Sequence, residues 1–253
     1  MRRGVEVEAI VQRESGYHPA MLLALLFQVA LLQPAQLLPT ALAAPPTVFP
    51  VRFLVAEGEA GPVADTAWLD AQLADANRIF ADWGVQFARA EVVPLPAPHG
   101  VLEDRPARNA LGALVVGQVI NAFIVASLRD VDDPKLFRQG VHWRPAGRTA
   151  DKRGRIKHLV IVAAYARPTV LAHELGHFFG NPSHTHVPGN IMSYNRGDTP
   201  PTLDARQGRH VQAFARQAVR SGELVPVVAA APDTAEAPSA PVAPAPPPVI
   251  APK

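Results

Sequence analysis

The chain has 253 residues, 27 prolines and no cysteine, and its formal net charge at pH 7 is only +2. The absence of cysteine excludes a disulfide framework, a cysteine nucleophile and thiolate metal ligands, so any metal site must be built from nitrogen and oxygen. The small net charge and the lack of a long basic run give no indication of nucleic-acid binding. The prolines are concentrated near both ends, which predicts one globular domain between them.

The N-terminal part of the chain has the layout of an export signal. Residues 21–32 form an apolar run that is too short for a permanent membrane span. Small residues follow at 41–44, with cleavage expected after Ala43 or Ala44. We therefore expect residues 1–44 to be a signal peptide, with Met21 as an alternative start, and the mature protein to be secreted or periplasmic without a stable membrane anchor.

The first elements of the domain follow in quick succession. Residues 48–56 are typical of a strand bounded by a glycine-rich turn. Apolar side chains then recur every three or four residues over 65–83, which predicts a long helix with Asp65 or Thr66 as its N-cap. Gly84 ends that helix, and residues 85–93 alternate as a second strand.

The middle of the chain is rich in short strands. Residues 118–128 and 158–164 are continuous apolar runs that predict buried strands, residues 140–144 predict a short edge strand, and residues 105–114 predict a short helix. Three aspartates, Asp130, Asp132 and Asp133, lie in a loop and are interpreted as solvated, with a calcium site as the alternative.

The last third begins with Pro168, which is predicted to open a helix. A proline is tolerated in the first turn of a helix, because the N–H that it lacks would have no partner there. Residues 204–220 predict a final helix. From residue 223 the chain becomes a tail rich in proline and alanine, interpreted as disordered or as a spacer. The predicted globular domain is therefore residues 45–222, and the tail is residues 223–253.

Residues 173–180 read His-Glu-Leu-Gly-His-Phe-Phe-Gly and are the most informative stretch of the chain. Side chains four residues apart lie on the same face of successive helical turns, so His173 and His177 would direct both imidazoles to one point. Glu174 lies beside them, close enough to polarise a metal-bound water without ligating the metal. Two imidazoles with a neighbouring carboxylate are typical of zinc hydrolases that keep one coordination position open for water.

A catalytic zinc site usually has three protein ligands, so a third ligand must follow the helix. Gly180 can adopt a left-handed conformation that ends the helix and turns the chain back. His184 is the preferred third ligand beyond that turn, and His186 is the alternative. Glu223 is badly placed, because it lies beyond the last predicted helix. Two aspartates rank below the histidines as third ligands, Asp198 and Asp204.

The motif H-E-x-x-H-x-x-G at residues 173–180, with a following histidine and Asn-Ile-Met-Ser-Tyr at residues 190–194, resembles the metzincin clan of zinc endopeptidases. That clan has the pattern H-E-x-x-H-x-x-G-x-x-H and a downstream methionine turn. Members such as astacins and serralysins have a tyrosine two residues after the turn methionine that can be an additional, displaceable zinc ligand. By this resemblance Met192 would form the hydrophobic floor under the zinc, and Tyr194 would be the extra ligand.

The chain departs from the clan pattern at one position. The pattern puts the third histidine at residue 183, where this sequence has Ser183, and serine is a poor zinc ligand. His184 stands one residue later, an offset that a small bulge at Asn181 and Pro182 can absorb.

The resemblance implies an α+β fold of the zincin type, metzincin-like in its details. Such a fold has a twisted, mostly parallel sheet with an antiparallel edge strand, a long backing helix, an active-site helix and a C-terminal helix. The order of the elements predicted above agrees with that arrangement, with residues 140–144 as the edge strand.

The predicted function is that of an exported zinc metalloendopeptidase. Zinc held by His173, His177 and His184 would activate a water, and Glu174 would be the general base. Tyr194 would help to stabilise the oxyanion, and a peptide or protein substrate would add to the edge strand. A monomer is expected.

Two other functions remain open at this point. One is a catalytically weak zinc-binding module that holds a peptide or protein on the same scaffold. The other is an exported structural domain in which the histidines form only a hydrogen-bonded core cluster.

Overall fold

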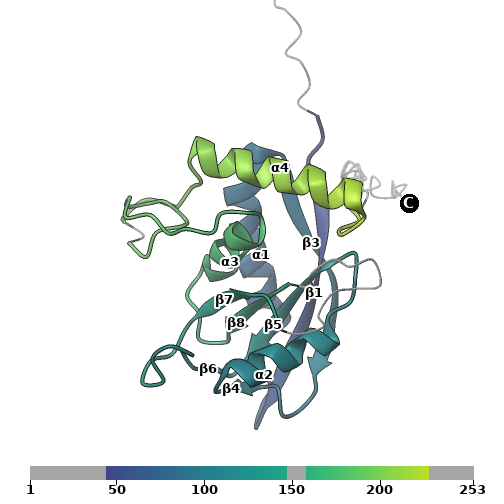
Figure 1. The fold of residues 1–253 in the computed structure, drawn as a ribbon, viewed down its shortest axis with the longest axis vertical. Coiled ribbons are helices and arrows are strands. Elements are labelled where there is room, and N and C mark those ends of the chain that lie inside the picture. The colour runs from purple at the N-terminus through teal and green to yellow at the C-terminus, as the bar shows by residue number, and fades with distance from the viewer. Residues whose placement is uncertain (1–43, 147–157, 196, 228–253) are drawn as a thin grey trace, which may run out of the picture. The chain divides into compact units, whose positions relative to one another are not determined.

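The computed structural model describes residues 44–146, 158–195 and 197–227 (Figure 1). The predicted signal peptide lies outside the described residues except for Ala44, as does most of the tail. Within the described ranges, no helix is long and apolar enough to cross a membrane.

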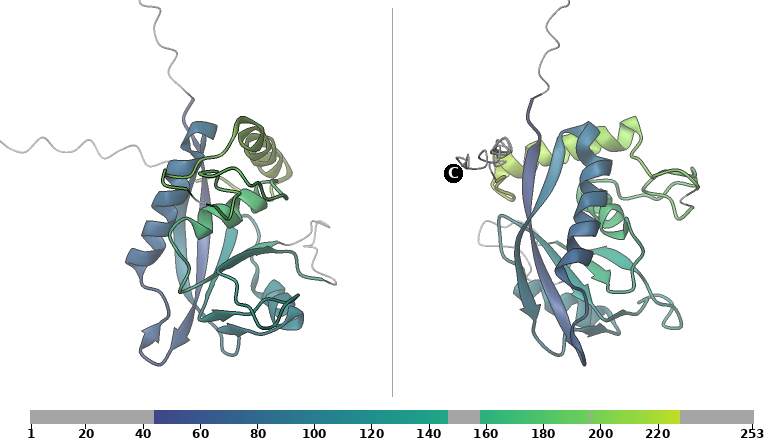
Figure 2. Two further views of the ribbon diagram at one scale, coloured as in Figure 1. Left: turned by 90° about the vertical axis from the view of Figure 1, so that its left-hand side faces the viewer. Right: turned by 180° about the vertical axis from the view of Figure 1, so that it is seen from behind.

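The architecture is α+β, built on a mixed sheet whose twist is visible in Figure 2. Four strands run parallel in the order β3–β1–β5–β8, and β7 closes one edge antiparallel to β8. Their bounds are Thr47–Gly58 for β1, Val85–Leu95 for β3, Ile120–Val125 for β5, Gly140–Trp143 for β7 and Leu159–Ala163 for β8. A two-residue strand, β2 (Gly61–Pro62), folds back on the end of β1. The predicted mostly parallel sheet with an antiparallel edge strand is confirmed.

The inner strands are buried on both faces. Every residue of β5 and β8 is buried, as their continuous apolar runs predict for parallel strands covered on both sides. In β1 the alternating side chains Phe49, Val51 and Phe53 belong to one core cluster, whereas Leu54 belongs to a second cluster on the opposite face. The sheet therefore separates two apolar layers.

Helices α1 (Thr66–Phe80) and α3 (Val170–Phe178) contribute to the first layer, which contains the larger core. Asp65 is the N-cap of α1 and accepts a hydrogen bond from the Trp68 backbone N–H at 2.8 Å. The helix continues as the 3₁₀ turn η1 (Ala81–Trp83) and ends at Gly84, whose φ of 67° is left-handed.

The opposite layer is smaller and consists of short elements around Leu102, Leu111 and Leu128. These elements are α2 (Arg105–Ala110), the 3₁₀ turn η2 (Leu111–Leu114) and the parallel pair β4 (Val101–Leu102) and β6 (Ser127–Leu128).

The last helix, α4 (Ala205–Ser221), begins with a capping box between Asp204 and Gln207. Gly208 allows close packing on η1, since a Cβ there would lie 2.0 Å from the Trp83 ring. The packed part of the chain continues past residue 222, because Leu224 is buried and Val227 pairs with Val48.

Two local predictions were wrong. Pro168 does not open α3; the helix begins at Val170, after Thr169 with a left-handed φ of 72°. Asp130 is not solvated, because its carboxylate is buried and accepts hydrogen bonds from Arg138 and from two backbone N–H groups of its own loop.

Candidate metal centre

Three histidines converge at the C-terminal half of α3. His173 and His177 come from successive turns of the helix, and His184 comes from the loop that follows. The Nε2 atom of His184 lies 3.2 Å from Nε2 of His173 and 3.2 Å from Nε2 of His177. His186 is exposed and stands outside this group.

Backbone carbonyl groups orient both helical histidines. The His173 Nδ1 atom lies 2.7 Å from the Ile191 carbonyl oxygen, and the His177 Nδ1 atom lies 2.7 Å from the Asn181 carbonyl oxygen. A carbonyl oxygen only accepts, so each Nδ1 carries the proton and each Nε2 presents a lone pair to the cluster. Burial lowers the pKa of His177, while the bond to Asn181 opposes that shift, so the neutral, metal-binding form is favoured.

The loop after α3 returns to the helix through a methionine. Met192 is fully buried, and a Cβ on Gly176 would lie 2.4 Å from its Sδ atom. Only a glycine lets the sulfur approach the helix so closely. The Met192 backbone is held in turn, because its N–H donates to Asn190 Oδ1 at 2.8 Å and its carbonyl accepts from the Thr185 N–H at 3.0 Å.

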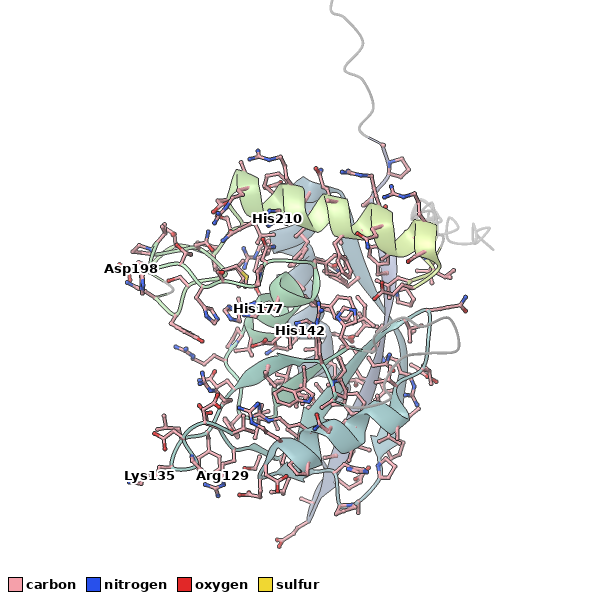
Figure 3. The ribbon with its side chains drawn as sticks, in the orientation of Figure 1. Arg129, Lys135, His142, His177, Asp198 and His210 are labelled. Atoms are coloured by element: carbon pink, nitrogen blue, oxygen red, sulfur yellow. The ribbon has the colours of Figure 1, made fainter. Side chains whose placement is uncertain are left out.

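A buried amide pair ties this turn to α4. Asn190 Nδ2 donates to Gln207 Oε1 at 2.9 Å, and Gln207 Nε2 donates to Asn190 Oδ1 at 3.2 Å. His210 of α4, labelled in Figure 3, bonds the Asn181 side chain at 3.1 Å. The C-terminal helix therefore braces both segments that supply carbonyl groups to the histidines.

The chain turns where Gly180 has a left-handed φ of 90°. Ser183 is exposed and does not belong to the histidine group, whereas His184 does. The loop thus brings His184 to the cluster despite the one-residue offset at Ser183.

Glu174 is buried beside the edge strand. A Cβ on Gly140 of β7 would lie 2.9 Å from both Cγ and Oε1 of Glu174, so the carboxylate rests directly against the strand backbone. The Glu174 carboxylate therefore lies between α3 and the edge strand β7.

The ring of Tyr194 lies against two of the three histidines. Its ring centroid is 4.4 Å from that of His184 and 6.0 Å from that of His173. Tyr194 is 63% exposed, so most of the residue is in contact with solvent.

Sequence reasoning missed a second chain of polar groups beside α3. His142 Nε2 lies 2.8 Å from His158 Nδ1, and His158 Nε2 lies 2.8 Å from a Glu223 carboxylate oxygen. The His158 ring stacks on Phe178 at 3.8 Å between centroids. Burial and then the neighbouring His158 lower the pKa of His142 to about 2; Arg144 and His177 contribute less. His142 and His177 are labelled near each other in Figure 3.

The sequence predicts that Glu223 is badly placed to bind a metal, and in the structure its carboxylate contacts His158. The hydrophobic pattern of β7 and β8 could indicate that His142 and His158 lie near each other, but only the chain's return after α4 brings Glu223 to them.

The histidine cluster fits a zinc ion by the chemistry of its donors. Three nitrogens at about 2.0–2.1 Å from a tetrahedral zinc lie about 3.3 Å apart, close to the 3.2 Å separations from His184. The Nε2 lone pairs of His173 and His177 both point into the cluster, because hydrogen bonds from Nδ1 to backbone carbonyl groups orient the two rings. Without cysteine, the donor set is entirely nitrogen and oxygen.

Comparison with solved structures gives distant similarities. The chain resembles metalloproteinase-II from Bacteroides fragilis with 14% identity and a TM-score of 0.45, over 67% of this chain and 53% of that one. For archaemetzincin from Methanopyrus kandleri the identity is 15% and the TM-score 0.41, over 66% and 96% of the two chains. For mirolysin they are 12% and 0.47, over 72% and 97%.

This chain therefore spans about half of the Bacteroides protein. No protein-family model and no curated protein sequence matches it. At these identities and TM-scores the similarity assigns no activity to this chain.

Proposed function

We propose that this protein is a zinc-dependent endopeptidase of the metzincin-like type. The observation that carries the proposal is the set of three imidazoles converging on one point, two of them with Nδ1 held by carbonyl groups, beside the buried carboxylate of Glu174. His173, His177 and His184 would hold the metal. A bound zinc ion would supply a Lewis acid that polarises water and the scissile carbonyl group.

Glu174 would handle the protons of the reaction. Its carboxylate would accept a proton from the attacking water and later give it to the leaving amine. Its packing against Gly140 restricts the carboxylate to the space between α3 and the edge strand, so little reorganisation is needed during the reaction.

The substrate backbone would bind along β7. Among the described residues, β7 is the edge strand of the sheet. It pairs with β8 on one side, and no described strand pairs with its other side. A peptide in extended conformation could add as a further strand through main-chain hydrogen bonds. Its scissile bond would then lie next to Glu174, which borders the same strand at Gly140.

Tyr194 would contribute from its place against the His184 ring. Its hydroxyl group would stabilise the negative charge that develops on the carbonyl oxygen. Export to the periplasm or the medium is also part of the proposal, and it rests on the pattern of residues 1–44 alone.

Metal analysis and peptide hydrolysis test the proposal together. We expect the purified protein to contain close to one zinc per chain, and to cleave members of a broad peptide library until a chelator is added. His184→Ala should lose the metal, whereas the matched variant His186→Ala should keep it.

Glu174→Ala separates the proposed enzyme from a zinc-binding module. We expect this variant to keep its zinc and to lose peptide hydrolysis. A wild-type protein that contains zinc but cleaves no peptide would support the binding module. A protein without zinc would show that the histidines are a structural cluster.

A further inference from the structure

A chain of hydrogen bonds runs from the segment after α4 to the edge strand. A Glu223 carboxylate oxygen lies 2.8 Å from His158 Nε2, and His158 Nδ1 lies 2.8 Å from His142 Nε2. The Glu223 backbone is fixed on both sides, because its N–H donates to the Ala218 carbonyl oxygen at 2.9 Å and its own carbonyl accepts from the Gln118 N–H at 3.1 Å. The chain therefore starts from an anchored carboxylate and ends on β7.

Both imidazole rings pack against Phe178, the residue after His177. The His158 ring stacks on Phe178 with 3.8 Å between the centroids, and the His142 ring meets it edge-on at 5.7 Å. The two histidines lie on the same face of the β7–β8 pair, because His142 is opposite Val160, two residues after His158. The sheet and α3 thus fix where both rings lie.

The carboxylate determines which nitrogen of each ring carries a proton. A carboxylate oxygen accepts, so His158 Nε2 donates to Glu223. In a neutral His158 the other nitrogen is then an acceptor, so the proton between the two rings belongs to His142 Nε2. His142 is neutral as well, since burial and then the neighbouring His158 lower its pKa to about 2. Its Nδ1 atom therefore has a lone pair and no proton.

This Nδ1 atom is open to solvent. In the described part of the chain the His142 side chain has one hydrogen bond, which joins Nε2 to His158. Among the described residues, Arg108 Nε is the buried side-chain nitrogen without a partner, so the unpartnered Nδ1 of His142 is not buried. The two nitrogens of an imidazole face nearly opposite directions, and Nε2 is directed at the residue that precedes β8. The lone pair of Nδ1 therefore faces away from β8, towards the open side of β7.

The same face of β7 borders the proposed catalytic carboxylate. Gly140 and His142 are two residues apart, so they project to one face of the strand. A Cβ on Gly140 would lie 2.9 Å from Glu174 Oε1, and the His142 ring contacts Phe178, one turn further along α3. A peptide that adds to β7 would place one side chain beside Gly140 and the side chain two residues away beside His142.

We propose that His142 determines substrate specificity, because its Nδ1 atom accepts a hydrogen bond from the peptide side chain beside it. Hydroxyl, amide and ammonium groups can donate such a bond, whereas aliphatic side chains and ionised carboxylates cannot. Glu223 and His158 are positioning residues, since they act only through the proton on His142 Nε2. The substrate rests on the proposed peptidase function, but the state of the His142 ring does not.

Nitrogen NMR of the metal-free protein with isotope-labelled histidine tests the ring without any activity. The His142 signals are assigned by their loss in His142→Phe. At about pH 8, well above the ordinary histidine pKa of about 6.5, we expect Nε2 to be protonated and Nδ1 to be unprotonated. Glu223→Leu removes the acceptor that directs the chain, so both tautomers of His142 should then be populated.

Glu59→Leu, in the exposed turn between β1 and β2, is the matched control and should leave the His142 signals unchanged. A protonated Nδ1 in the wild type would overturn the proposal. Equal changes in Glu223→Leu and Glu59→Leu would overturn the role of Glu223.

A peptide array tests the specificity with the zinc-loaded protein. The peptides carry asparagine or its near-isostere leucine at each position in turn. Cleavage is measured with the wild type, and binding is measured with Glu174→Ala, which is not expected to hydrolyse them. We expect asparagine to be preferred about threefold to tenfold at one position, which is the effect of one hydrogen bond. The preference should disappear in His142→Phe, decrease in Glu223→Leu and persist in Glu59→Leu.

The outcomes separate this inference from the proposed function. Cleavage without such a preference, or with one that His142→Phe retains, would overturn the inference alone. Glu223→Leu leaves both rings in place, so it decides the question if His142→Phe does not fold. A wild type that cleaves nothing, with a Glu174→Ala variant that still prefers asparagine through His142, would refute the proposed function alone. A protein that neither cleaves nor binds peptides would overturn both.

Discussion

Gly176→Ala tests whether the turn around Met192 sets the geometry of the proposed metal ligands. The added Cβ would lie 2.4 Å from Met192 Sδ and 3.4 Å from its Cε. Sulfur and carbon cannot approach so closely, and Met192 is fully buried, so we expect its side chain and the turn that carries it to move away from α3. Ile191 precedes Met192, and its carbonyl group is the partner of His173 Nδ1 at 2.7 Å. The displacement would therefore reach His173, a proposed metal ligand, through one peptide unit.

Two effects on folding nearly cancel in this variant. Overpacking a core contact costs about 1–3 kcal/mol, and replacing a helical glycine by alanine returns about 1 kcal/mol. We expect a net loss of roughly 0–2 kcal/mol in the free energy of unfolding. Zinc affinity should fall much more clearly, by about 10- to 100-fold, which is the usual effect of losing the group that orients a histidine ligand.

Competition against a chromophoric chelator measures the zinc affinity, and denaturant titration of the metal-free protein measures stability. Gly117→Ala is the control, since nothing lies within 4 Å of a Cβ there and the glycine has no left-handed φ. The reasoning is refuted if Gly176→Ala binds zinc as tightly as the wild type. Truncation of the sulfur in Gly176→Ala/Met192→Ala should recover part of the affinity, because the added Cβ then has room.

Three further predictions concern stability. Because the pKa of His142 is about 2 in the folded protein and 6.5 when unperturbed, the unfolded chain binds a proton that the folded protein excludes. The free energy of unfolding should therefore decrease as the pH falls below about 6.5, by up to about 2 kcal/mol between pH 7 and pH 5. In denaturant titrations of the metal-free protein at these two pH values, His142→Gln should show a smaller decrease than the wild type. An equal decrease in both proteins would contradict this prediction. Asn190→Ala strands the buried Gln207 amide and the Met192 N–H and should cost roughly 2–4 kcal/mol by the same assay, whereas Asn195→Ala in an exposed turn should cost little. Gly208→Ala drives a Cβ into the Trp83 ring and should lower Tm despite the better helix propensity; an unchanged Tm would show that α4 can shift freely on η1.

Local patterns determined most of the architecture. Alternating or continuous apolar runs predicted β1, β3, β5 and β8, because a strand buried against helices must present such a pattern. The three-and-four spacing predicted α1 and α4. The boundaries were less accurate where the cause is tertiary: α3 begins after a left-handed residue, and residues 223–227 pack on the domain through Leu224 and Val227.

The sequence also predicted the part of the site that lies on α3. Spacing alone places His173 and His177 on one helix face with Glu174 beside them, because helix geometry is the same in any protein. The third histidine was a choice between His184 and His186, since spacing along a loop does not determine where its side chains point. The path of the loop decided it, through the Thr185–Met192 pairing and the turn at Gly180.

The partners of the site came only from the tertiary structure. Gln207 reaches Asn190, and Glu223 reaches His158, although the members of each pair are well separated in the chain. No periodicity relates such residues, because their meeting depends on how the sheet edge, the methionine turn and the segment after α4 pack together. The sequence by itself determined which groups could do the chemistry, and the fold decided which groups hold them in place.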